Sequence, residues 1–159
     1  MTYRTSTARD LPYTSRDFLY GVVQEIQSYA DLEKNWDGEG ALPVIEEVRN
    51  NATSVVRRLY KTWGAPEVTP SSNGTIVFEW SHDNVEFYLE IGKDNYCFLA
   101  GDENGYRNDL ALAGKLEEAS YREILSSGGK LWKGYSQENI SVLTPSSQMH
   151  LQTGIAHDA

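Results

Sequence analysis

The chain has 159 residues and a mass of 17.9 kDa, a size that suits one domain. Aromatic residues make up 11% of it, which supplies enough large apolar surface for a core and excludes wholesale disorder. No run approaches the roughly eighteen apolar residues of a membrane-spanning helix, and the polar first residues carry no secretory signal. A single cysteine, Cys97, excludes an internal disulfide. We therefore expect a cytoplasmic protein.

The chain is acidic, with 23 Asp and Glu against 14 Lys and Arg and a net charge of −9. The stretch from Glu67 to Asp109 contains nine acidic and two basic residues, so its net charge is −7. Because each phosphate contact needs a cation, the balance argues against direct binding to nucleic acid, and nothing in the sequence points to a membrane. The charge fits either plain solubility or a surface that attracts a basic partner.

Residues 1–12 show no apolar periodicity, and we expect a flexible arm. Helical spacing of apolar residues then predicts one helix that begins at Thr14 or Ser15 and ends near Lys34. A second predicted helix opens at Pro43 and is stopped by Gly64. Two amphipathic helices joined by a short loop make an αα-hairpin.

The apolar period then changes from helix to strand. Residues 65–74 are expected to form a connection, followed by strands at 75–80, 85–91 and 96–100 whose apolar side chains alternate. An antiparallel sheet with this pattern exposes one face to solvent, and the helical hairpin can cover the other face. The sequence thus predicts an α+β fold in which the N-terminal αα-hairpin packs on a three- to four-stranded antiparallel sheet.

The last third of the chain has weaker patterns. We expect a loop at 101–108 and a third helix from about Leu110 to Ser126, ended by the pair Gly128 and Gly129. Residues 136–159 are rich in Ser, Gln, Thr and Pro and are expected to be a flexible tail, with at most a short strand at 140–143. Residues 13–135 then form a single domain.

The run NWDGEGA between the two predicted helices has the composition of a turn. Two carboxylates in a glycine loop suggest a hard cation, but the further oxygen ligands of a calcium loop are lacking, so we predict no metal. The structural residues of this turn are Asn35, Trp36, Asp37, Gly38 and Gly40, with Trp36 as an anchor in the core or, alternatively, for a partner.

The stretch from Tyr29 to Ile91, with NWDGEGA, the following Pro43 and the later run NGTIVFEW, resembles a family of small uncharacterised bacterial proteins. That family carries an NWDGxGA motif and a later (L/F)-E-W strand. Asn73 departs from the acidic turn residue of the family pattern, and the chain from Leu110 onward lies outside the resemblance. The resemblance implies the order of helices and strands and no catalytic residue.

No catalytic constellation is evident: the histidines lack the spacing of zinc ligands, and no nucleophile elbow or phosphate loop occurs. We therefore predict no catalytic residue and no cofactor. The residues expected to bind a partner project from one sheet face and are Glu79, Glu86, Tyr88 and Glu90. Further aromatic residues expected to be exposed are Tyr96, Trp132 and Tyr135.

These patterns favour a non-enzymatic acidic protein that binds another macromolecule. Inhibition of that macromolecule is one outcome that such binding could have. Antitoxins, immunity proteins and phage inhibitors of host defence have this character, and a basic nucleic-acid-binding protein is one candidate partner. The oligomeric state is left open. The alternative is a small enzyme, metal-dependent in one version, whose site is built from the carboxylates Asp37, Glu39, Glu79 and Glu90.

Overall fold

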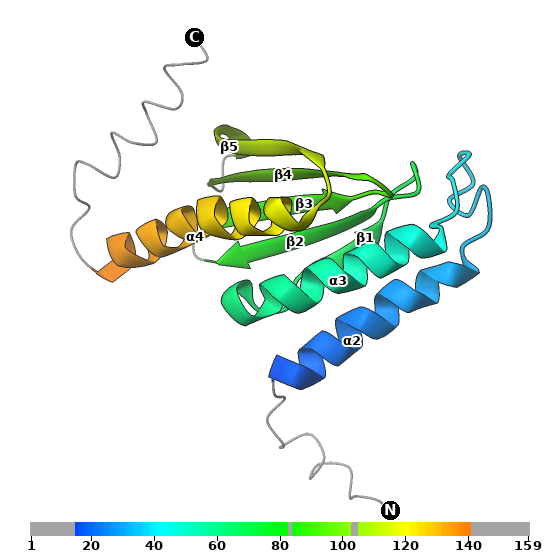
Figure 1. Ribbon diagram of the computed structural model, residues 1–159, viewed down its shortest axis with the longest axis horizontal. Helices are drawn as coiled ribbons and strands as arrows, with labels where there is room; N and C mark the ends of the chain where they lie inside the picture. The colour runs from blue at the N-terminus through cyan, green and yellow to red at the C-terminus, as the bar shows by residue number, and fades with distance from the viewer. Residues whose placement is uncertain (1–14, 83, 103–104, 141–159) are drawn as a thin grey trace, which may run out of the picture.

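A computed structural model describes residues 15–82, 84–102 and 105–140 of the chain. It is an α+β fold in which one antiparallel sheet carries helices on one face (Figure 1). The predicted arm of residues 1–12 lies outside the described residues, as do residues 141–159 of the predicted tail. No helix in the described ranges combines the length and apolar character needed to cross a membrane.

Helix α2 (Ser15–Ser28) continues into the short helix η1 (Tyr29–Asp31), and α3 (Glu46–Trp63) lies antiparallel beside α2. The predicted pair of packed helices is therefore present. Its connection is longer than expected, since it runs from Leu32 to Ile45 and α3 begins three residues after Pro43. Buried Ile26 and Val56 belong to the apolar stripes that join the two helices to the core.

The sheet has five strands in sequence order, where three or four were expected: β1 (Glu67–Pro70), β2 (Ile76–His82), β3 (Val85–Ile91), β4 (Asn95–Asp102) and β5 (Gly105–Lys115). Every neighbouring pair is antiparallel. Strands β2, β3 and β4 match the three predicted strands within a few residues. Strand β1 forms inside the expected connection, where pairing with β2 orders a segment that has little periodicity of its own.

The expected loop at 101–108 and the expected start of a helix at Leu110 are both wrong. Strand β5 occupies this region, because its residues pair with β4 from Ala100 down to Asn95. The third helix, α4 (Glu118–Ile140), begins eight residues later and passes through Gly128 and Gly129 without ending. It also extends beyond the expected domain boundary at residue 135, and Ile140, the expected start of a short strand, is its last residue.

The core lies between the sheet and the helices. The phenylalanines Phe78, Phe87 and Phe98 stand on neighbouring strands and are fully buried. Trp63, the last residue of α3, packs against this row, with its ring centroid 4.7 Å from that of Phe87 and 5.7 Å from that of Phe98. This burial attaches the end of α3 firmly to the sheet, which positions the groove described below.

Candidate functional site: an acidic groove on the open sheet face

The sheet has a second face on which no described helix packs, and we call it the open face (Figure 1). Residues directly opposite each other on antiparallel strands point to the same face. Glu79 lies opposite Tyr88, and Ser81 lies opposite Glu86. Since the neighbouring residues Phe78, Trp80, Phe87 and Leu89 are buried under the helices, Glu79, Glu86, Tyr88 and Glu90 share the open face.

A groove of about 430 Å³ opens beside Glu79 at the end of the sheet where α3 leads into β1. It exists because β1 begins at Glu67, opposite Glu79, so that residues 80–82 of β2 extend beyond the reach of β1. The indole Nε1 of Trp80 donates a hydrogen bond of 3.0 Å to the carbonyl oxygen of Gly64 and ties β2 to the chain leaving α3.

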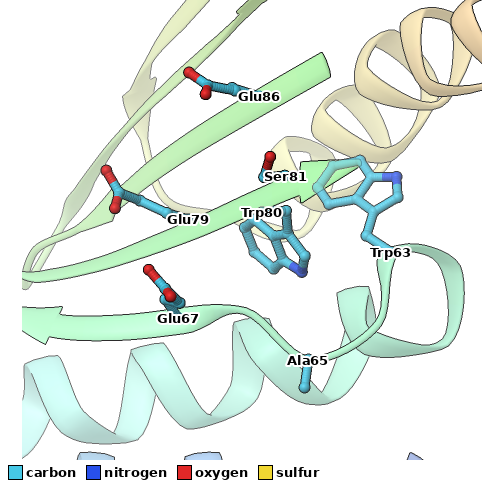
Figure 2. Close-up of a pocket in the computed structure, with 7 residues that line it drawn as sticks. All are labelled: Trp63, Ala65, Glu67, Glu79, Trp80, Ser81 and Glu86. Carbon is cyan, nitrogen blue, oxygen red and sulfur yellow. The ribbon is translucent and has the colours of Figure 1, made fainter. Parts of the chain in front are cut away.

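Three carboxylates from three adjacent strands line this groove: Glu67 from β1, Glu79 from β2 and Glu86 from β3 (Figure 2). We call this site the acidic groove; its remaining lining consists of Trp63, Ala65, Trp80 and Ser81. The two indoles are almost fully buried, so they form a firm wall. The site therefore pairs concentrated negative charge with an apolar side.

None of the three carboxylates forms a hydrogen bond or ion pair within the described part of the chain. Glu67 lies directly opposite Glu79, an arrangement of like charges that destabilises a sheet. The groove thus holds negative charge that the described residues do not neutralise, and a cation from outside would relieve the repulsion.

Glu90 differs from these three because its carboxylate is already occupied. Its Oε1 accepts hydrogen bonds from the Thr75 hydroxyl at 2.6 Å and the Asn73 amide at 3.2 Å, and its Oε2 accepts one from the Tyr88 hydroxyl at 3.1 Å. Burial acts to raise the pKa of Glu90, but these three hydrogen bonds outweigh it and the pKa lies below its ordinary value. Glu90 therefore orders the open face internally and is less available than Glu79 to a partner.

The aromatic residues expected at the surface are less accessible than predicted. Tyr88 is half-buried, and burial together with the charge of Glu90 raises its pKa to about 12. Tyr96 lies opposite Ile91 on the helix side of the sheet and is buried, so the prediction that it is exposed is wrong. The side chains of Trp132 and Tyr135 lie outside the described part of the structure.

The NWDGEGA segment forms the expected turn through side chain to backbone hydrogen bonds. Asp37 Oδ1 accepts from the amides of Glu39 at 2.8 Å and Ala41 at 3.0 Å, and Asn35 Oδ1 accepts from the Gly40 amide at 2.6 Å. These bonds from the Glu39 and Ala41 amides lower the pKa of Asp37. Positive φ angles of 80° at Gly38 and 95° at Gly40 explain why both positions are glycine.

Trp36 is only half-buried and does not belong to the core cluster, so the prediction of a core anchor is wrong. Its indole Nε1 instead donates a hydrogen bond of 3.0 Å to the carbonyl oxygen of Leu42. The Trp36 side chain therefore links the two ends of the turn through this hydrogen bond. The connection contributes Val44 to the core instead, and Ala41 beside it is also buried.

The four carboxylates of the enzyme hypothesis are not gathered into one site. Asp37 and Glu39 belong to the connection between α2 and α3, at the opposite end of the helices from the acidic groove (Figure 1). Glu79 lies in the groove, and Glu90 is held by Thr75, Asn73 and Tyr88. Across the described ranges, no group of three or more His, Cys, Asp or Glu residues is arranged to hold a metal ion.

Only Glu79 and Glu86 of the groove were predicted from the sequence; the five residues not predicted are Trp63, Ala65, Glu67, Trp80 and Ser81. Trp63 and Trp80 lie in the core and also line the groove. Glu67 was placed in a connection. Glu67-Val68-Thr69 alternates polar and apolar residues, but a run this short gives only a weak strand signal.

No family model matches this chain, and comparison with curated proteins and with solved structures found no match. The resemblance of the NWDGEGA segment to a bacterial family therefore stays a prediction.

Proposed function

We propose that this chain is a non-enzymatic, cytoplasmic interaction protein whose acidic groove binds a basic segment of another protein and thereby inhibits it. The observation that carries the proposal is that Glu67, Glu79 and Glu86 line one groove without a neutralising cation among the described residues. Antitoxins, immunity proteins and phage inhibitors of host defence are the classes that fit, and a nucleic-acid-binding protein is a partner of suitable charge.

The groove suits a lysine or arginine side chain better than a diffuse basic surface. Such a side chain has an apolar stem and a cationic end. The wall of Trp63, Ala65 and Trp80 can pack against the stem, while carboxylates on neighbouring strands receive the charged end (Figure 2). Charge of one sign gathered in a concave site also speeds the approach of a basic partner, and this effect weakens as salt is added.

An arginine-rich peptide is the probe for the first test. We expect it to change the tryptophan fluorescence of the full chain at low salt, with an affinity that falls steeply as salt rises. The variant Glu67→Gln/Glu79→Gln/Glu86→Gln should bind the peptide at least about tenfold more weakly, since each substitution removes a charge contact. A matched control, Glu33→Gln/Glu39→Gln/Glu46→Gln, makes the same change in net charge at exposed positions outside the groove.

Equal losses in the two triple variants would mean that only net charge matters, and the proposal would then fail. The second test identifies the partner by capture from the native host with the wild-type chain and with both variants. A protein that is retained by the wild type and by the control, but lost with the groove variant, is the expected result. Glu90→Gln should have a smaller effect than Glu79→Gln, because Glu90 is already hydrogen-bonded.

A further inference from the structure

Residues 1–14 join the described part of the chain at Ser15, the first residue of α2. Because α2 and α3 are antiparallel, Ser15 lies at the same end of the helix pair as Trp63, which ends α3 and forms part of the groove wall (Figure 1). A hydrogen bond of 3.1 Å from Gln27 to Thr53 fixes how far the two helices overlap. At about 1.5 Å per residue, the start of α2 lies about 18 Å from this bond, and the end of α3 lies about 15 Å from it in the same direction. Residues 1–14 therefore enter the fold level with the acidic groove.

The groove is within reach of this segment. The axes of packed helices are about 8–10 Å apart, and Ala65, just after the end of α3, already lines the groove. At about 3.3 Å per residue, an extended chain spans about 20 Å from Ser15 back to Arg9 and about 36 Å back to Arg4. Both spans exceed the separation of the two helices, so either arginine can be carried to the groove without a change in the fold.

The charge of the segment complements that of the groove. Residues 1–14 contain two arginines, Arg4 and Arg9, and one acid, Asp10, within a chain whose net charge is −9. The groove offers three carboxylates and an apolar wall of two indoles. An arginine has an apolar stem and a planar cation that binds carboxylates and stacks on aromatic rings. The segment thus carries the cation that the described residues do not supply to the groove.

We propose that residues 1–14 bind in the acidic groove of their own chain, with their arginines held by its three carboxylates. The tether favours this occupant, because a short linker gives an effective concentration on the order of millimolar. Ordering the segment costs conformational entropy, so the bound and released states are in equilibrium. A basic partner must then displace the segment. This competition rests on the proposed function, whereas the binding of the segment does not.

The test is NMR spectroscopy of the full chain at low salt, read at the backbone amides. The amides of residues 1–14 should have chemical shifts away from random-coil values, and the triple glutamine variant of the groove or high salt should return them to those values. The triple control variant outside the groove should leave them as in the wild type. Conversely, Arg4→Gln/Arg9→Gln should shift the amides of the groove. The control Lys34→Gln/Lys93→Gln removes the same charge at two exposed positions outside the groove and should not.

The arginine-rich peptide measures the competition. Since the segment must leave before the peptide enters, Arg4→Gln/Arg9→Gln should bind the peptide about two- to tenfold more tightly than the wild type and than Lys34→Gln/Lys93→Gln. Circular dichroism of each variant checks that the fold is retained. Equal affinities in these three chains overturn the competition.

The NMR readout decides the binding of the segment independently of the peptide. Amides of residues 1–14 that do not respond to the groove variant overturn the inference, whatever the peptide does. A response that grows with protein concentration also overturns it, because the segment then binds a second copy. A response at every concentration, in a chain that binds no peptide, supports the inference and refutes the proposed function.

Discussion

Gly128 of α4 lies directly against the indole ring of Trp63, so that a Cβ atom at position 128 would stand 2.7 Å from Cζ2 of that ring. The same Cβ would lie 3.0 Å from the ring of Phe98. Helix α4 can therefore approach the sheet this closely only with a glycine at this position. The contact explains why Gly128 lies inside a helix that it was expected to end.

We predict that Gly128→Ala destabilises the fold by about 1–3 kcal/mol, because the added methyl group overpacks a rigid part of the core. Urea unfolding measures the change. The neighbouring Gly129 is the matched control, since a Cβ there meets no atom within 4 Å. Gly129→Ala should stabilise the chain by up to about 1 kcal/mol through helix propensity alone. Equal effects of the two substitutions would contradict the contact between α4 and Trp63.

Removing one charge from the acidic groove should make the folded chain more stable. Glu67→Gln relieves the repulsion between Glu67 and Glu79, which lie opposite one another, and should raise the free energy of unfolding by about 0.2–1 kcal/mol at low salt. High salt should shrink the gain. In a double-mutant cycle, Glu79→Gln should stabilise wild type more than it stabilises Glu67→Gln. Additive effects would show that the two carboxylates do not interact.

The hydroxyl of Thr75 should control the pKa of Glu90, because it donates the shortest of the three hydrogen bonds that lower it. Thr75→Val should raise that pKa, as measured by an NMR titration of the side-chain carboxyl carbon. The control is Thr69→Val, at an exposed position of strand β1. It should leave the pKa of Glu90 unchanged.

The same substitution has a consequence for stability as a function of pH. A carboxyl with a lowered pKa in the folded state stabilises the fold above its unfolded pKa, and this contribution is lost as the pH falls through the folded value. The stability deficit of Thr75→Val should thus be largest at neutral pH and should narrow on acidification. A deficit that is constant from neutral to acidic pH would mean that the substitution acts through packing and leaves the charge of Glu90 unaffected.

Trp36→Ala should destabilise the chain by about 1–2 kcal/mol, less than the roughly 3–5 kcal/mol expected for emptying an aromatic core site, because the ring is half-buried. Trp36→Phe keeps much of the ring contact and loses the hydrogen bond from Nε1 to Leu42, so it should cost about 0.5–1.5 kcal/mol. Thermal and urea unfolding test both variants. If Trp36→Ala lowers the free energy of unfolding by more than about 3 kcal/mol, Trp36 contributes to stability as a core residue does, which would contradict this prediction.

The local sequence was sufficient to predict the elements whose side chains repeat with a clear period. The alternation in β3 placed Phe87 and Leu89 inward and Glu86, Tyr88 and Glu90 outward, and the register confirms this division. The turn chemistry of Asn35 and Asp37 was predictable for a similar reason, since short polar side chains bond to amides only a few residues away. These features depend on interactions between near neighbours in the chain.

Only the tertiary structure decided β1, β5 and the passage of α4 through its two glycines. Each of these depends on a partner outside the segment itself: β1 on β2, β5 on β4, and Gly128 on Trp63. The alanines and leucines of Leu110–Lys115 suit a helix as well as a strand. The segment forms a strand because its backbone can hydrogen-bond to β4. The acidic groove follows from the same cause, because Glu67 reaches Glu79 and Glu86 only once β1 has paired with β2.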